Sequence, residues 1–219
     1  MFALIRKDLQ IEFRTKETVA ALLLLGLLTL TVLSFAFDPT SALRADAAPG
    51  ALWVAVIFAG VLGLSRSFVA ERENDCLHGL LLSPVDRGTI YLAKAIANAL
   101  FMLTAQAVIV PIFLFFFNVP VGLHLFGVML AVVLGLVGFS AVGTLFAAIS
   151  VRTRVREVML PLLMLPLTVP IFIAGVKVTG RLLAGKSWAD VAPWLHLMVG
   201  FDVIFLVVGW VVFEYAIEE

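Results

Sequence analysis

The chain has little charge and few residues with reactive side chains. Of its 219 residues, 14% are charged and 63% are hydrophobic, a balance that soluble globular domains do not have. Its one cysteine, Cys76, excludes an internal disulfide and a cysteine metal cluster. Lys plus Arg and Asp plus Glu number 15 each, so no overall electric field attracts nucleic acid. We therefore expect an integral membrane protein surrounded by lipid, with no metal site and no nucleic-acid partner.

Motifs for ATP binding and for hydrolysis are also missing. The sequence has no Gly-x-x-x-x-Gly-Lys-Ser/Thr loop for phosphates, no His-Glu-x-x-His zinc motif and no Gly-x-Ser-x-Gly elbow. We therefore expect a non-catalytic protein that binds no cofactor directly.

Long apolar segments define the fold class. Residues 95–151 contain no Asp, Glu, Lys or Arg, and at about 20 residues per crossing such a run makes two helices and a turn. Backbone groups in lipid must pair within the chain, which favours helices. The pattern predicts a single all-α membrane domain over residues 1–219 with six transmembrane helices. The predicted spans are 19–37, 50–65 (its helix starting at Pro49), 90–117, 123–151, 158–176 and a last span ending near 217.

The distribution of Lys and Arg predicts the orientation. Eleven of these residues fall on the side that holds both termini, and four fall on the other side. Because positive residues concentrate in cytoplasmic loops, we expect both termini to be cytoplasmic. Lys177, Arg181 and Lys186 are a minor exception on the outer side.

The N-terminal residues 1–18 have the pattern of a helix lying in the cytoplasmic membrane interface. Four apolar residues share one narrow helical face: Phe2, Ile5, Leu9 and Phe13. The basic residues Arg6, Lys7, Arg14 and Lys16 lie elsewhere on the helix, a pattern that suits an interfacial helix.

Residues 177–200 differ from an ordinary span. They contain Trp188 and Trp194, and tryptophan favours the membrane–water boundary, so we expect one or two short helices at the outer surface. Asp202 follows Gly200 near the expected start of the last span. An intramembrane carboxylate is a functional candidate, but an N-cap at the outer end of the span is the interpretation we favour.

A polar stretch, Arg66 to Lys94, interrupts the apolar pattern with eight charged residues. We expect the second span to continue past Arg66, followed by a short helix over 74–82 with Leu77, Leu80 and Leu81 on one face. Such a two-sided helix suits docking into a groove of a partner. The alternative is that these leucines lie against the protein's own span ends.

The Ser83-Pro84-Val85-Asp86 segment predicts the start of the third helix. Ser83 suits the N-cap, Pro84 the first helical position, and Asp86 the third position of a capping box.

Three prolines interrupt the fifth span, namely Pro161, Pro166 and Pro170. Proline removes a backbone donor from the helix ladder, so these residues are a candidate hinge or part of a substrate path. Prolines are also tolerated in membrane helices when neighbours satisfy the freed carbonyls. Both interpretations remain open.

Several segments resemble the haem-exporter B family (CcmB), permease subunits of the cytochrome c maturation system with the type-2 ABC permease fold. The resemblance extends along the whole chain. The matching segments are Arg6-Lys7-Asp8-Leu9, Leu52-Trp53-Val54-Ala55, Glu71-Arg72-Glu73, Leu80-Leu81-Leu82-Ser83-Pro84-Val85-Asp86-Arg87, Ala93-Lys94, Leu165-Pro166-Leu167-Thr168-Val169-Pro170 and Phe201-Asp202-Val203-Ile204-Phe205.

This resemblance implies a permease of the bacterial inner membrane that works as a homodimer with a cytoplasmic ABC ATPase subunit. ATP and Mg²⁺ would bind the ATPase, and the short loop helix would be its coupling helix. The interface would comprise Glu71, Arg72, Leu77, His78, Leu80, Leu81, Ser83, Pro84, Asp86 and Arg87. Further implied partners are haem-handling membrane subunits and a haem chaperone. Either haem crosses through the complex, or ATP hydrolysis releases the haem-loaded chaperone.

Haem itself would need axial ligands, for which histidine is common. His124 and His196, with Asp202, are weak candidates for haem or substrate contact on the outer side. We expect partner subunits to hold haem in the main.

Two alternatives remain for the function. The chain could be the permease of another type-2 exporter, for drugs, lipids or polysaccharides. It could also be a stand-alone secondary transporter, which would place paired charges or broken helices at mid-membrane. Among the charged residues only Asp202 comes near such a position.

Overall fold

The computed structural model describes residues 1–14, 16–38, 41–73, 86–149 and 156–218. Within these ranges the chain forms seven helices and no strand. Six of them are long and apolar enough to cross a membrane, which confirms the predicted all-α, six-span class. The helices are α1 (Phe2–Arg14), α2 (Lys16–Ala36), α3 (Ala42–Glu73), α5 (Arg87–Phe116), α6 (His124–Ile149), α7 (Arg156–Leu183) and α8 (Trp188–Glu218).

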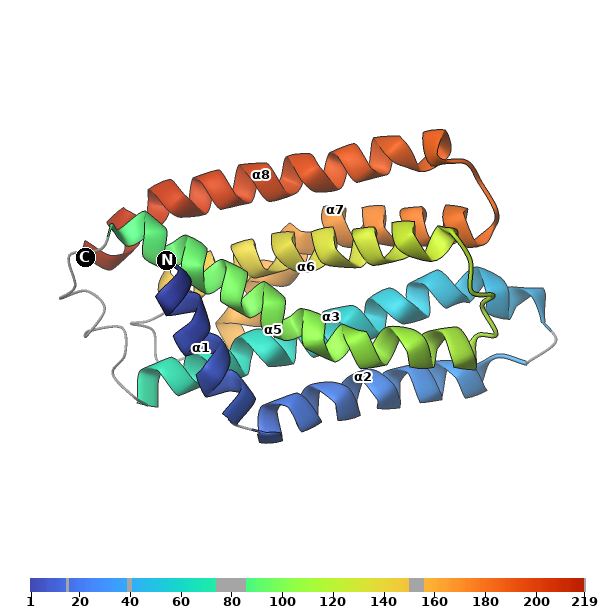
Figure 1. Cartoon of the computed structure of the whole chain (residues 1–219), viewed down its shortest axis with the longest axis horizontal. Coiled ribbons are helices and arrows are strands. Elements are labelled where there is room, and N and C mark those ends of the chain that lie inside the picture. The colour runs from blue at the N-terminus through green and yellow to red at the C-terminus, as the bar shows by residue number, and fades with distance from the viewer. Residues whose placement is uncertain (15, 39–40, 74–85, 150–155, 219) are drawn as a thin grey trace.

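The six long helices run side by side along the long axis of the molecule, and α1 crosses α5 obliquely (Figure 1). Both chain termini lie at one end of this bundle, together with the end of α3 and the start of α5 (Figure 1). We call this end the N/C end and the other the opposite end. The turns after α5 and after α7 lie at the opposite end. The polar stretch therefore leaves and re-enters the bundle where both termini lie.

Helix α3 is longer at both ends than the predicted second span. Its extension to Glu73 confirms the expected continuation past Arg66. At the other end α3 begins at Ala42, so Pro49 lies inside the helix and the predicted start at Pro49 is wrong. The reason is local: the Ser41 hydroxyl accepts a hydrogen bond from the Leu43 backbone N–H at 3.1 Å, as capping side chains do.

The structure does not contain the one or two short surface helices expected over 177–200. α7 continues to Leu183, and a linker of residues 184–187 leads directly into α8. The end of α7 is a Schellman motif, with Gly185 at φ 71° and the Lys186 N–H donating to the Arg181 carbonyl oxygen at 2.9 Å. Asp190 then accepts hydrogen bonds from the Ser187 backbone N–H and hydroxyl, and the first of these is one of the two bonds of a capping box at the start of α8.

Glycines bring three helices together around Trp53 of α3. The indole is 1% exposed, and its Nε1 donates to the Thr179 hydroxyl of α7 at 3.0 Å. A Cβ placed on Gly135 of α6 or Gly175 of α7 would overlap the indole ring. Small residues permit such close approach of membrane helices, so these two positions fix how α6 and α7 pack on α3.

A substitution at Gly175 tests this packing. Gly175→Ala forces a methyl group into the space of the Trp53 ring, so we expect a loss of about 1–3 kcal/mol in the free energy of unfolding. The matched control is Gly200→Ala in α8, where a Cβ meets nothing within 4 Å and alanine favours the helix. Unfolding of both variants in detergent, monitored by circular dichroism, measures the difference. Equal stability of the two variants would contradict the packing.

Candidate functional site

The segment expected to contact an ATPase is described only at its two ends. Glu71 and Arg72 lie in the last helical turn of α3. Asp86 and Arg87 lie at the start of α5. The remaining interface candidates lie outside the described residues, so their arrangement remains a prediction: Leu77, His78, Leu80, Leu81, Ser83 and Pro84.

Asp86 has a different role at the start of α5 from the one predicted. It is the N-cap, and its Oδ2 accepts a hydrogen bond from the Thr89 backbone N–H at 3.1 Å. The helix therefore begins at Arg87, and the prediction that Asp86 occupies the third helical position is wrong. A carboxylate pairs well with free N–H groups at a helix start, where the helix dipole is also favourable.

A small apolar cluster at the N/C end joins the start of α5 to three other helices. Its buried members are Ile90, Tyr91, Ala95, Leu145 and Phe213, and Leu4 of α1 packs against them. This cluster is separate from the main core, which contains Trp53. The first two turns of α5 are thus fixed to α1, α6 and α8 at once.

Tyr91 is the centre of this cluster and is fully buried. Its hydroxyl donates to the Ala141 carbonyl oxygen of α6 at 2.9 Å, and the Phe205 carbonyl oxygen of α8 lies 3.2 Å from the same hydroxyl. Gly209 provides the space, because a Cβ there would overlap the phenol ring. We refer to this contact of α5, α6 and α8 as the Tyr91 junction.

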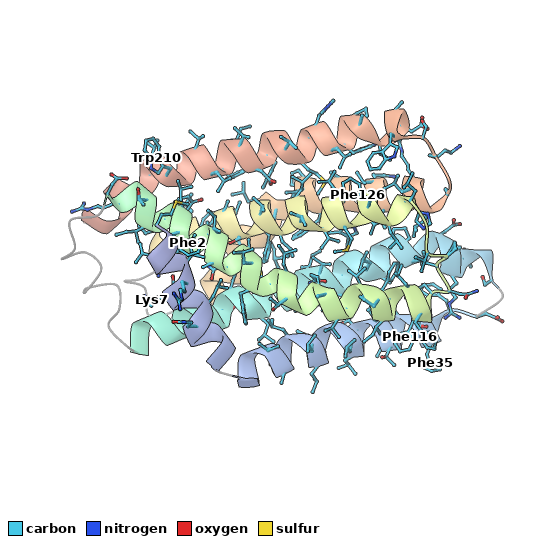
Figure 2. All side chains as sticks on the ribbon, viewed as in Figure 1. Phe2, Lys7, Phe35, Phe116, Phe126 and Trp210 are labelled. Carbon is cyan, nitrogen blue, oxygen red and sulfur yellow. The ribbon has the colours of Figure 1, made fainter. Side chains whose placement is uncertain are left out.

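The first turn of α5 makes a second glycine contact with α8. A Cβ on Gly88 would overlap the indole of Trp210, and Figure 2 labels Trp210 on α8, where the N/C end of that helix passes α5. Sequence reasoning singled out neither this pair nor Tyr91. A tyrosine within an apolar span was the signal that could have indicated this contact. A buried tyrosine hydroxyl usually has a hydrogen-bond partner, here on another helix.

Asp202 lies in the middle of α8 and does not cap it. The residue is 5% exposed, and neither carboxylate oxygen has a hydrogen-bond partner among the described residues. The side chain points towards α6 and α7, because a Cβ on Gly138 would overlap Oδ1 of Asp202 and the side chain of Ile171. The favoured interpretation as a cap is therefore wrong, because the capping box at Ser187 starts α8 well before Asp202.

The two histidines predicted to face the outer side do not form one site with Asp202. His124 is the first residue of α6, and its Nε2 is buried without a hydrogen-bond partner among the described residues. His196 is exposed on α8. Asp202 comes six residues after His196 and is buried, so it faces a different side of α8. Across the described residues there is also no group of three His, Cys, Asp or Glu side chains that could hold a metal.

The prolines of α7 do not end that helix, which is continuous from Arg156 to Leu183. Pro166 and Pro170 are exposed, and the side chain of Pro161 lies outside the described part. The Thr168 hydroxyl between them donates to the Met164 carbonyl oxygen at 3.0 Å. Their proposed role as a hinge remains a prediction.

The fold is that of a multi-pass integral membrane protein, with six helices able to span a membrane and both termini at one end. The sequence model of the family described as CcmB protein matches residues 1–219, so the chain belongs to the CcmB family.

Several relatives carry the name "Heme exporter protein B", and three of them show the extent of the similarity. The protein from Rhodobacter capsulatus is 29% identical over 181 residues, 83% of each chain. The one from Pseudomonas aeruginosa is 28% identical over 192 residues, 88% of this chain and 86% of the relative. The one from Bradyrhizobium diazoefficiens is 27% identical over 207 residues, 94% and 92% of the two chains.

Removing only the hydroxyl of Tyr91 tests the junction. Tyr91→Phe keeps the ring in its packing and removes one hydrogen bond, so the expected loss of stability is about 0.5–1.5 kcal/mol. Tyr91→Ala also empties the space between α5 and α8, and its expected cost is about 3–5 kcal/mol. Chemical denaturation of both variants in the same detergent compares them. A hydroxyl that made no hydrogen bond would leave Tyr91→Phe as stable as the wild type.

The contact between Asp202 and Gly138 can be tested by a double-mutant cycle. We expect Gly138→Ala to cost about 1–3 kcal/mol through overpacking. Asp202→Ala removes the carboxylate that the new methyl group would meet, so it should recover part of this loss in the Gly138→Ala background. The measured quantity is the coupling energy from the unfolding of the four proteins. Strictly additive effects would show that the two residues do not touch.

Proposed function

We propose that this chain is the permease subunit of an ABC transporter that serves haem export during cytochrome c maturation. The observation that carries the proposal is the match of the CcmB family model to the full length of a six-span chain. The relatives that cover more than four fifths of the chain are named as haem exporters. We place the protein in the bacterial inner membrane.

An ABC ATPase subunit docks on the segment between α3 and α5, in this proposal. Two observations support this location. The segment leaves and re-enters the bundle at the end that holds both termini, and the eleven Lys and Arg residues of that side favour a cytoplasmic location. ATP and Mg²⁺ bind the ATPase, since this chain has no phosphate-binding loop. The permease is thus the non-catalytic partner and binds no cofactor itself.

The Tyr91 junction provides a path from the docked ATPase to the membrane helices. A displacement at the start of α5 acts directly on α8 through Gly209 and Trp210, and on α6 through the hydrogen bond to Ala141. Close-packed helices shift as units, because packed interfaces are not continuously deformable. A second copy of the chain completes the permease, and the two copies move with the two ATPase subunits.

Haem is the substrate of the complex, and partner subunits hold it. Support for this division comes from the separate positions of His124, His196 and Asp202. It also comes from the burial of the His124 Nε2, which has no hydrogen-bond partner among the residues that the structure describes. Haem-handling membrane subunits and a haem chaperone complete the system. Both versions of the final step, haem passage or release of the loaded chaperone, use the same ATP-driven motion.

Co-purification with the ATPase tests the docking. Leu80→Asp and Leu81→Asp place a charge on the proposed contact face, and we expect about tenfold or greater loss of bound ATPase, because a buried unpaired charge is costly. The control is Leu123→Asp, since Leu123 is 85% exposed in the turn before α6 at the opposite end. If both loop variants bind the ATPase as well as the wild type does, this segment is not the docking site.

A further inference from the structure

A groove with a volume of about 500 Å³ lies between α3 and α7 on the side of the bundle. Trp53, Val54 and Ile57 line it from α3, and Leu165 and Val169 line it from α7. Val54 and Val169 are exposed, while the Trp53 indole forms part of the buried core. All the lining side chains are apolar except that of Lys177.

The one charged residue in the lining is Lys177 of α7. It is exposed and makes no salt bridge with the residues that the structure describes. Its neighbour Arg181 differs, because its guanidinium donates to the Asp190 carbonyl oxygen and lies over the Trp194 ring. Lys177 is thus a cation at an apolar surface for which the described part of the chain provides no salt bridge. It belongs to the basic group that the charge rule leaves unexplained on the outer side.

The length of the groove matches one leaflet of a bilayer. From Leu165 to Lys177 the groove follows α7 for twelve residues, about 18 Å at 1.5 Å per residue. Half of a hydrocarbon core about 30 Å thick is about 15 Å. Lys177 lies six residues, about 9 Å along the helix, before Leu183, where α7 ends at the opposite end. A long lysine side chain at this depth extends towards the lipid headgroups, and the apolar part of the groove reaches towards mid-membrane.

We propose that the groove between α3 and α7 binds one anionic phospholipid from the leaflet at the opposite end. An acyl chain lies along Val54 and Val169, and the phosphate pairs with Lys177. The apolar lining provides binding of the chain, and the lysine provides preference for an anionic headgroup over a zwitterionic one. The proposal depends on the membrane fold and is independent of haem export.

Fluorescence of Trp53 reports on the occupant, because this residue lines the groove. The full chain with Trp188, Trp194 and Trp210 replaced by Phe has Trp53 as its single tryptophan. It is placed in phosphatidylcholine vesicles that contain a minor fraction of brominated phosphatidylglycerol or, in the second arm, brominated phosphatidylcholine. We expect the apparent affinity for the anionic lipid to be about fivefold higher, the size of one lysine–headgroup attraction.

Matched variants identify the groups responsible. Lys177→Gln should abolish the preference for phosphatidylglycerol, whereas Lys186→Gln, a linker residue outside the lining, should retain it. Val169→Phe narrows the groove and should reduce quenching by both lipids, and Val203→Phe on the exposed side of α8 should not. Native mass spectrometry of the unmodified protein in phosphatidylglycerol, compared with its Lys177→Gln variant, gives the same comparison without the tryptophan replacements.

Three results would overturn the proposal. Equal quenching by the two lipids would show that Lys177 does not select an anionic headgroup. A preference for phosphatidylglycerol that persists in Lys177→Gln would show the same. Absence of quenching by either lipid shows that another protein surface, such as a second copy, covers the groove. Displacement of brominated phosphatidylglycerol by added haem assigns the groove to haem instead. None of these results bears on ATPase docking, so the proposed function is tested separately.

Discussion

In a bilayer, each backbone N–H and C=O must find its partner inside the protein, and this constraint shapes the rest of the molecule. Each crossing segment pairs its own backbone N–H and C=O groups as a helix, so few backbone groups are available for hydrogen bonds between helices. The helices are held together by close approach at glycines, as where α6 and α7 meet the Trp53 indole of α3. The few hydrogen bonds between helices, such as that of Trp53 to Thr179, then fix particular pairs in register.

The same constraint makes the polar groups inside the bundle informative. Tyr91 satisfies its hydroxyl with backbone carbonyl oxygens of two other helices, and so connects the start of α5 to α6 and α8. This connection lies next to the segment where we place the ATPase. Asp202 has no comparable partner among the described residues. Its position facing α6 and α7 makes it the intramembrane carboxylate from which a functional role is most expected.

Much of the fold could be predicted from the sequence because length and apolarity alone define a span. The helix starts were harder, since they depend on single side chains. Pro49 has the residue type of a helix start, but Ser41 starts α3. Ser187 and Asp190 have capping-box spacing, yet the tryptophans nearby suggested surface helices. Because short surface helices were expected up to Gly200, the last span was expected to start near Asp202. Asp202 was therefore interpreted as the cap of that span. Contacts such as those of Tyr91 with α8 join residues far apart in sequence, and no local pattern encodes them.

The central claim is that the segment between α3 and α5 contacts an ABC ATPase on the cytoplasmic side. Cys76 is the only cysteine of the chain and lies within that segment, so a photoreactive maleimide can be attached there without mutation. The most direct measurement is photocrosslinking from Cys76 in membranes that contain the whole complex, with a Cys76→Ser chain as the blank. Our account predicts a crosslink to the ATPase subunit, and labelling of Cys76 by an impermeant reagent only after the cytoplasmic side is opened. Labelling from the outer side, or crosslinks that never include the ATPase, would contradict it.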